Sequence, residues 1–270
     1  MARTLDPERI AAIAAAHEQA RRTVTPIDRV TRAHPDLTLD DAYAIQQAWV
    51  DLQVANGASI RGHKIGLTSR AMQQAMRIDE PDFGALLDDM FLADGATIRA
   101  ADYIDPKIEV ELAFVLRDRL GAPDVTATDV YAATDHIIPA LELIDARSHR
   151  VDPADGTPRT VRDTIADNAA DAAIVTGGSP TRPGETDLRW VVAIMKRNGT
   201  VEETGVAAGV LDDPVTGVVW LARRLHGLGI TLEAGETVLA GSFTRPVDLR
   251  AGDHIEVEFR DLGRITLDVS

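Results

Sequence analysis

The sequence predicts an α+β protein in which a helical segment precedes a β-rich body. Apolar residues recur at helical spacing before residue 57, which favours amphipathic helices there. From residue 91 onward, short apolar runs separated by turn residues are typical of strands. No Gly-rich phosphate loop, internal repeat or low-complexity tract is present. We therefore divide the chain into a helical segment, 1–57, and a β-rich domain, 58–270.

The two N-terminal helices have clear sequence signals. The first is predicted over about 6–22, where Ile10, Ile13 and His17 lie on one side. The second is predicted to begin after a capping box at Thr38 and to end at Gly57. Further elements are expected as a strand at 60–67, a helix at 70–76, an acid-dense loop at 79–90, strands at 96–99 and 107–117, a helix at 126–134 and strands at 136–145 and 171–178.

The C-terminal part is predicted to continue the β structure around one helix. Residues 190–204 form a hairpin with Asn198-Gly199 as a type I′ turn. A helix begins at Pro214, a residue suited to the first helical position, and runs to about 228. Strands follow near 237–241, 254–259 and 263–269. The polar stretch 145–168 is too long for a simple connection and is expected to be a lid or a loop of the functional site.

Composition narrows the class of protein. With 270 residues and 45% apolar content the chain can bury a sizeable core. The absence of cysteine excludes disulfides and thiolate metal sites. A net charge of −15 without a basic stripe argues against nucleic acid. The N-terminus lacks the apolar region of a signal peptide and no run reaches the ~20 residues of a membrane span, so we expect a cytoplasmic protein.

Three glutamates sit within two apolar strands. Glu109 and Glu111 share one face of the run 106–116, because strand side chains alternate with period two. Glu142 lies in the middle of the apolar run 137–145. Clustered carboxylates without Cys or His in the same strands suit a hard cation such as Mg²⁺ or Mn²⁺. The alternative is that the glutamates face solvent from an edge strand.

A lysine and an aspartate are candidates for proton transfer. Lys64 lies in an apolar strand between two glycines, where a buried ammonium requires an acidic partner that can tune its pKa. It could equally be the ion-pair partner of a core carboxylate. His63 alternates to the other face and is expected to pack in the core. Asp82, between Pro81 and Phe83, is the acid of its loop most suited to a specific role.

Candidates for binding an anionic substrate follow two of the predicted strands. Arg147 comes five residues after Glu142 and could bind a carboxylate through both nitrogens, or could simply be a surface residue. Asn168 ends the long loop as a polar contact or a turn residue. Residues 241–246 (GSFTRP) place Ser242, Thr244 and Arg245 after a strand, where an anion could bind or an ordinary turn could form.

An ordered set of motifs resembles the 2-oxopent-4-enoate hydratase family, which includes 4-oxalocrotonate decarboxylases and belongs to the fumarylacetoacetate hydrolase superfamily. The motifs are residues 62–68 (GHKIGLT), 81–84 (PDFG), 108–111 (IEVE), 139–142 (PALE) and 163–168 (DTIADN). The resemblance runs from about residue 35 to the C-terminus. It implies a rolled mixed-β core, Mg²⁺ bound by Glu109, Glu111 and Glu142, and a homo-oligomer, often a pentamer or decamer.

The resemblance also implies an activity. The family adds water to a 2-oxo-4-enoate that chelates the metal, and Lys64 assisted by Asp82 is expected to transfer protons, with acid and base roles left open. Segments 84–90, 143–147, 202–211 and 241–246 are most similar to members that act on the seven-carbon diacid 2-oxohept-4-ene-1,7-dioate. On this basis Thr244 and Arg245 are expected to hold the distal carboxylate.

Four alternatives remain at this stage. A five-carbon 2-oxopent-4-enoate hydratase or a decarboxylase would use the same metal and fold. An acylpyruvate C–C hydrolase would need a His-Glu pair near the metal, and none stands out. A non-catalytic metal- or oxo-acid-binding subunit would have no need for Lys64 together with three carboxylates.

Overall fold

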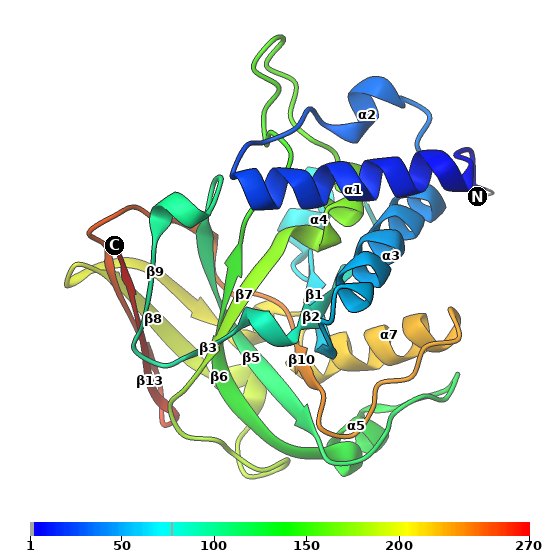
Figure 1. The fold of residues 1–270 in the computed structure, drawn as a ribbon. Helices are drawn as coiled ribbons and strands as arrows, with labels where there is room; N and C mark the ends of the chain where they lie inside the picture. The colour runs from blue at the N-terminus through cyan, green and yellow to red at the C-terminus, as the bar shows by residue number, and fades with distance from the viewer. Residues whose placement is uncertain (1–2, 77) are drawn as a thin grey trace.

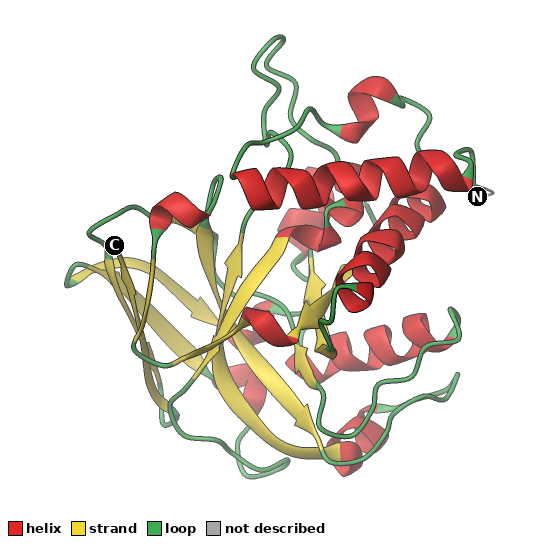
Figure 2. Ribbon diagram, in the orientation of Figure 1, coloured by secondary structure: helices red, strands yellow, loops and turns green. Residues whose placement is uncertain are grey.

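The computed structural model describes residues 3–76 and 78–270. Its strands form two sheets, with helices gathered on one side of the molecule (Figures 1 and 2). The helices are α1 Pro7–Thr23, α2 Val30–Ala33, α3 Leu39–Ala55, α4 Arg70–Met76, α5 Ala127–Ala133, α6 Val161–Ala166 and α7 Pro214–His226. Within the described residues, none of the helices is long and apolar enough to cross a bilayer.

The larger sheet carries the candidate site. In spatial order it contains β2 Asp82–Leu87, β1 Ile60–Gly66, β10 Thr237–Leu239, β5 Lys107–Leu116, β6 Thr134–Ile144, β7 Asp171–Thr176 and β3 Phe91–Ala93, while β11 Val247–Asp248 pairs with β5. The β1–β10 and β3–β7 pairs are parallel and the others are antiparallel, so the sheet is mixed. Strand β5 lies in its interior.

The smaller sheet contains β4 Ala96–Ile98, β13 Gly263–Val269, β12 His254–Phe259, β8 Val192–Arg197 and β9 Thr200–Val206. The β8–β9 hairpin turns at Asn198 and Gly199, whose φ angles of 53° and 80° are those of the predicted type I′ turn. One face of β5, with Ile108, Val110 and Leu112, packs in the main core with residues of this sheet and of α7. The opposite face of β5 is left for the glutamates.

The N-terminal helices form the second core cluster together with β2 and α6. Helix α3 begins as predicted, with Asp41 N–H donating to Thr38 Oγ1 at 3.1 Å and Thr38 N–H donating to the Asp41 carboxylate at 3.0 Å. Further along the same helix, Gln46 Nε2 donates to the carbonyl oxygens of Phe83 (2.8 Å) and Ile165 (3.1 Å). Helix α3 therefore positions both β2 and α6.

Two predictions about loops were wrong. Residues 82–87, expected within a loop, are strand β2, which is buried at every position. Burial of both faces removes the polar–apolar alternation that marks a strand, and the flanking acids conceal it. The segment 145–168 is not one continuous loop, because it contains α6 and a bridge between Val151 and Pro158. A six-residue helix is too short to produce a clear periodic pattern.

Candidate active site

The three predicted glutamates lie together. Glu109 stands opposite Glu142 in the antiparallel pairing of β5 with β6, and Glu111 follows two residues later on the same face. One carboxylate oxygen from each lies within 4.8 Å of the other two. Because β5 is paired along both edges and Glu111 and Glu142 are buried, the solvent-facing alternative is wrong.

The electrostatics of this cluster favour a cation. Burial, followed by repulsion from Glu142, raises the pKa of Glu109 to about 8 and the pKa of Glu111 well above its usual value. The Gly241 N–H donates to Glu111 Oε2 at 2.8 Å, but Glu111 Oε1 has no hydrogen-bond partner in the described part of the chain. Oxygens bound to one Mg²⁺ lie at most about 4.2 Å apart, so a small contraction of the cluster would suit the ion.

Lys64 supplies a buried positive charge beside the cluster. Its Nζ is 3.0 Å from Glu142 Oε1, and both side chains are almost fully buried. Burial acts to lower the pKa of Lys64, but attraction to Glu142, Asp82 and Asp171 outweighs it, and the pKa is raised above its usual value. Lys64 is therefore an ammonium group here, in the position predicted for it.

Asp82 lies next to Lys64 at the start of β2, opposite Gly66 in the β1–β2 pairing. A Cβ atom on Gly66 would stand 2.2 Å from Asp82 Oδ1 and 3.3 Å from Lys64 Nζ, so glycine makes room for this pair. Neither Asp82 oxygen has a well-oriented hydrogen-bond partner among residues 3–76 and 78–270. Burial raises the pKa of Asp82, in opposition to Lys64. A buried carboxyl group without hydrogen bonds is suited to exchanging a proton.

Asp171 is a fifth carboxylate of the site, and it was not predicted from the sequence. Asp171 begins β7 and is fully buried, and neither of its oxygens has a hydrogen-bond partner in the described chain. Burial raises its pKa well above the usual value, and repulsion from Glu142 adds to this effect. The sequence did contain a signal, because Asp171 opens the apolar run 172–175 directly after a predicted site motif.

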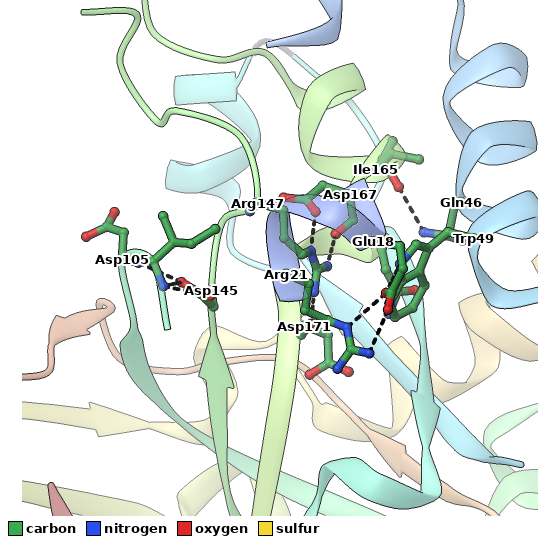
Figure 3. A network of polar contacts seen from close by, with 12 residues as sticks. Glu18, Arg21, Gln46, Trp49, Asp105, Asp145, Arg147, Ile165, Asp167 and Asp171 are labelled. Carbon is green, nitrogen blue, oxygen red and sulfur yellow. Dashed lines mark hydrogen bonds and ion pairs between the residues drawn. The ribbon is translucent and has the colours of Figure 1, made fainter. Parts of the chain in front are cut away.

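Arg147 has a structural role that differs from the predicted one. Its Nε contacts the Asp167 carboxylate, its Nη1 donates to the Asp171 carbonyl at 2.9 Å and its Nη2 donates to the Asp167 carbonyl (Figure 3). The guanidinium also stacks over Trp49, with its carbon 5.3 Å from the ring centre. Three of its five N–H donors are thus used within the chain, and the binding of a substrate carboxylate by Arg147 stays a prediction.

Asn168 is also engaged within the chain. Its Nδ2 donates to the Ala85 carbonyl and its Oδ1 accepts from the Ala85 N–H, both at 2.9 Å, so it holds β2. Its predicted contact with substrate stays a prediction. Asn168, Ala169 and Ala170 all have left-handed φ angles of 47°, 51° and 61°. Such consecutive strain persists only where surrounding contacts impose it, and this segment joins the Arg147 network to Asp171.

The motif at 241–246 divides between the site and the surface. Thr244 Oγ1 accepts from the Val110 N–H at 3.2 Å, and Ser242 Oγ lies 3.3 Å from the Val110 carbonyl. Both hydroxyls therefore border β5 between two of the clustered glutamates. Arg245 is different, because its side chain is 83% exposed and its Nη2 pairs with Glu203 Oε1 at 2.6 Å.

Comparison with known proteins identifies the family to which this chain belongs. Residues 54–270 match the family model described as fumarylacetoacetate (FAA) hydrolase, C-terminal, and the chain belongs to the fumarylacetoacetate hydrolase family. It is 54% identical over 249 residues to the 2-oxo-hept-4-ene-1,7-dioate hydratase of Escherichia coli, covering 92% of this chain and 93% of that protein. It is 39% identical to a 2-keto-4-pentenoate hydratase of Paraburkholderia xenovorans (strain LB400), covering 92% and 90% of the two chains.

A solved structure shows the same architecture. The 4-oxalocrotonate decarboxylase from Pseudomonas putida G7, complexed with magnesium and adipate, superimposes with a TM-score of 0.94 at 34% identity, covering 100% of both chains. The predicted family and the predicted mixed-β fold with N-terminal helices are thus confirmed.

Proposed function

We propose that this chain is a metal-dependent hydratase that adds water to 2-oxohept-4-ene-1,7-dioate, giving 4-hydroxy-2-oxoheptanedioate, in 4-hydroxyphenylacetate breakdown. The observation that carries the proposal is the buried cluster of Glu109, Glu111 and Glu142 with Lys64 Nζ 3.0 Å from Glu142. The 54% identity to the hydratase of Escherichia coli supports the choice of substrate. Assembly into a pentamer or decamer and a cytoplasmic location remain predictions.

The cluster would hold Mg²⁺, with Mn²⁺ as the alternative, through one oxygen of each glutamate. When bound, such an ion supplies Lewis-acid polarisation of the substrate's 2-oxo group. The Gly241 N–H fixes Glu111 by binding its Oε2, which leaves Oε1 for the ion. Ser242 and Thr244 keep the strand segment between the ligands in place through Val110.

Lys64 and Asp82 would move the protons. Lys64 Nζ can give a proton or stabilise negative charge on the substrate, and the Asp82 carboxyl group, free of strong hydrogen bonds, can exchange a proton at a neighbouring carbon or with the attacking water. The enclosing helices and β2 keep bulk water from this pair, since both side chains are buried. Electrostatic effects are stronger in such a site.

A decarboxylase is the second candidate, because the 4-oxalocrotonate decarboxylase structure matches the whole chain at a TM-score of 0.94. Both chemistries would use the same residues, so the product decides between them. A five-carbon hydratase is tested by the same assay with 2-oxopent-4-enoate, given the 39% identity to a 2-keto-4-pentenoate hydratase.

The test is identification of the product by NMR after incubation with 2-oxohept-4-ene-1,7-dioate, with Mg²⁺ or with EDTA. We expect 4-hydroxy-2-oxoheptanedioate with Mg²⁺ and recovered substrate with EDTA. Glu109→Gln should abolish metal-dependent turnover, whereas the exposed Glu233→Gln serves as a matched control and should not. Release of CO₂ from 4-oxalocrotonate, without hydration of the diacid, would contradict the hydratase assignment and support the decarboxylase.

A further inference from the structure

A second arginine of the segment 145–168, Arg159, has a buried side chain. Arg159 lies on a short hairpin in which its N–H donates to the Arg150 carbonyl at 2.9 Å and Val151 bridges Pro158. The hairpin rises beyond the β6 and β7 end of the larger sheet, near α2 (Figure 1). Arg150 uses its guanidinium to bind Asp105. Among the residues that the structure describes, the guanidinium of Arg159 has no comparable hydrogen-bonded partner.

The guanidinium of Arg159 is buried and only partly satisfied. Its side chain is 9% exposed, and Nη1 has no hydrogen-bond partner among the residues described. The nearest acid is Asp167, whose Oδ2 lies 3.5 Å away and already accepts from the Arg147 N–H at 2.8 Å. Burial lowers the pKa of Arg159 to about 10, so it is still a cation at neutral pH. A buried charge whose ion pair is shared with another arginine and whose Nη1 lacks a hydrogen bond in the described chain is costly unless a ligand completes it.

Arg159 is joined to the buried charges of the site through Asp167, which lies 3.5 Å from its Nη1 and also contacts Arg147, whose Nη1 donates to the Asp171 carbonyl at 2.9 Å. Glu142 of the metal cluster lies 3.0 Å from Lys64 Nζ, and Lys64 and Asp82 meet at Gly66. The charge of Arg159 is also among those that act to lower the pKa of Asp82, against the larger effect of burial. A 2-oxo diacid that chelates the metal with one end must place its second carboxylate beyond the proton-transfer residues. An anion there requires a cation besides Lys64, because the carboxylates of the site outnumber that lysine.

We propose that Arg159, rather than Arg245, binds the distal carboxylate of the substrate and gives the site its preference for a diacid. The inference rests on the proposed function. A buried guanidinium with a free N–H can form the charge-assisted bond that discriminates between substrates. Arg245 is a weaker candidate, because its side chain is 83% exposed and already pairs with Glu203.

The experiment compares two unreactive ligands by calorimetry in the presence of Mg²⁺: the diacid 2-oxoheptanedioate and the monoacid 2-oxopentanoate. Arg159→Leu should weaken diacid binding by about 10- to 100-fold, the effect of losing one hydrogen bond to a charged group, and should leave monoacid binding nearly unchanged. Arg245→Leu, the matched control, should leave the ratio of the two affinities as it is. Should Arg159→Leu fail to fold, Arg159→Gln removes the charge with a smaller change in polarity.

The outcomes separate the two proposals. Selective loss of the diacid in the Arg159 variants, with Arg245→Leu unaffected, supports the inference. Equal losses for both acids would assign Arg159 to structural support of Asp167, and selective loss in Arg245→Leu would assign the distal carboxylate to Arg245; either result overturns it. If neither acid binds the natural protein with Mg²⁺, the proposed function fails, and the inference with it.

Discussion

Replacing Glu111 with Gln tests the metal cluster by stability rather than by turnover. The three ligand oxygens lie within 4.8 Å of one another. Two full charges at that distance repel by about 3 kcal/mol at an effective dielectric constant of about 20. Without a cation, the folded chain must tolerate this repulsion or bind protons. Glu111→Gln removes one charge, and the amide oxygen can still accept from the Gly241 N–H.

We therefore expect the metal-free variant to be at least as stable as the natural protein. Addition of Mg²⁺ at about 100 times its Kd should stabilise the natural protein by about 2.7 kcal/mol. For a domain of this size, such a gain raises Tm by roughly 5–10 °C. The variant should show little of this shift, because the ion loses a charged ligand. The assay is thermal unfolding in EDTA and across a Mg²⁺ titration.

The exposed Glu233→Gln is the matched control and should keep the full Mg²⁺-dependent shift. An undiminished shift in Glu111→Gln, or no shift in the natural protein, would refute the assignment of the cluster as a cation site. A variant much less stable than the natural protein in EDTA would show that the ionised carboxylate contributes to folding in some other way.

Three further changes test the surroundings of the site. Gly66→Ala would place a methyl group 2.2 Å from Asp82 Oδ1, so turnover should fall by at least about 100-fold with the Mg²⁺ shift retained; unchanged steady-state rates would contradict this. Arg147→Leu removes the main partner of the buried Asp167 carboxylate and should cost about 3–5 kcal/mol in urea unfolding, and a loss below about 1 kcal/mol would count against the network. Burial lowers the pKa of His17 from 6.5, so the folded state binds its proton less tightly than the unfolded chain does. Stability should thus be full above pH 6.5 and fall below it by up to about 1.4 kcal/mol per pH unit, and His17→Leu should show a smaller fall between pH 7.5 and 5.5 in urea titrations; identical pH profiles would exclude this effect.

The elements predicted correctly are those with local, repeated signals. Helix α3 has its cap at Thr38, the β8–β9 hairpin has Asn198-Gly199, and β5 has a long alternation that places Glu109 and Glu111 on one face. In each case the signal lies within a few residues of the feature. The pairing of Glu142 with Glu109 follows once both strands are assigned to one sheet.

The features that were missed depend on distant partners. Arg147 resembles a substrate ligand in sequence, and only the fold shows that Asp167 and the Asp171 carbonyl accept hydrogen bonds from three of its donors. The burial of Asp171 depends equally on the neighbouring strands. Arg159 lies in a polar segment whose composition suggests exposure, yet its side chain is 9% exposed. Charge partners separated along the chain cannot be assigned from spacing alone.

Helix α3 has a consequence for engineering within this family. The region that matches the family model begins at residue 54, whereas the Gln46 and Trp49 contacts that hold β2, α6 and Arg147 come from before it. Strand β2, which carries Asp82, and the Arg147 network are therefore held in part by residues that precede the region of the family model. Grafting the catalytic set onto a family member with a different leading segment would transfer Asp82 without the support of β2, unless α3 were transferred as well.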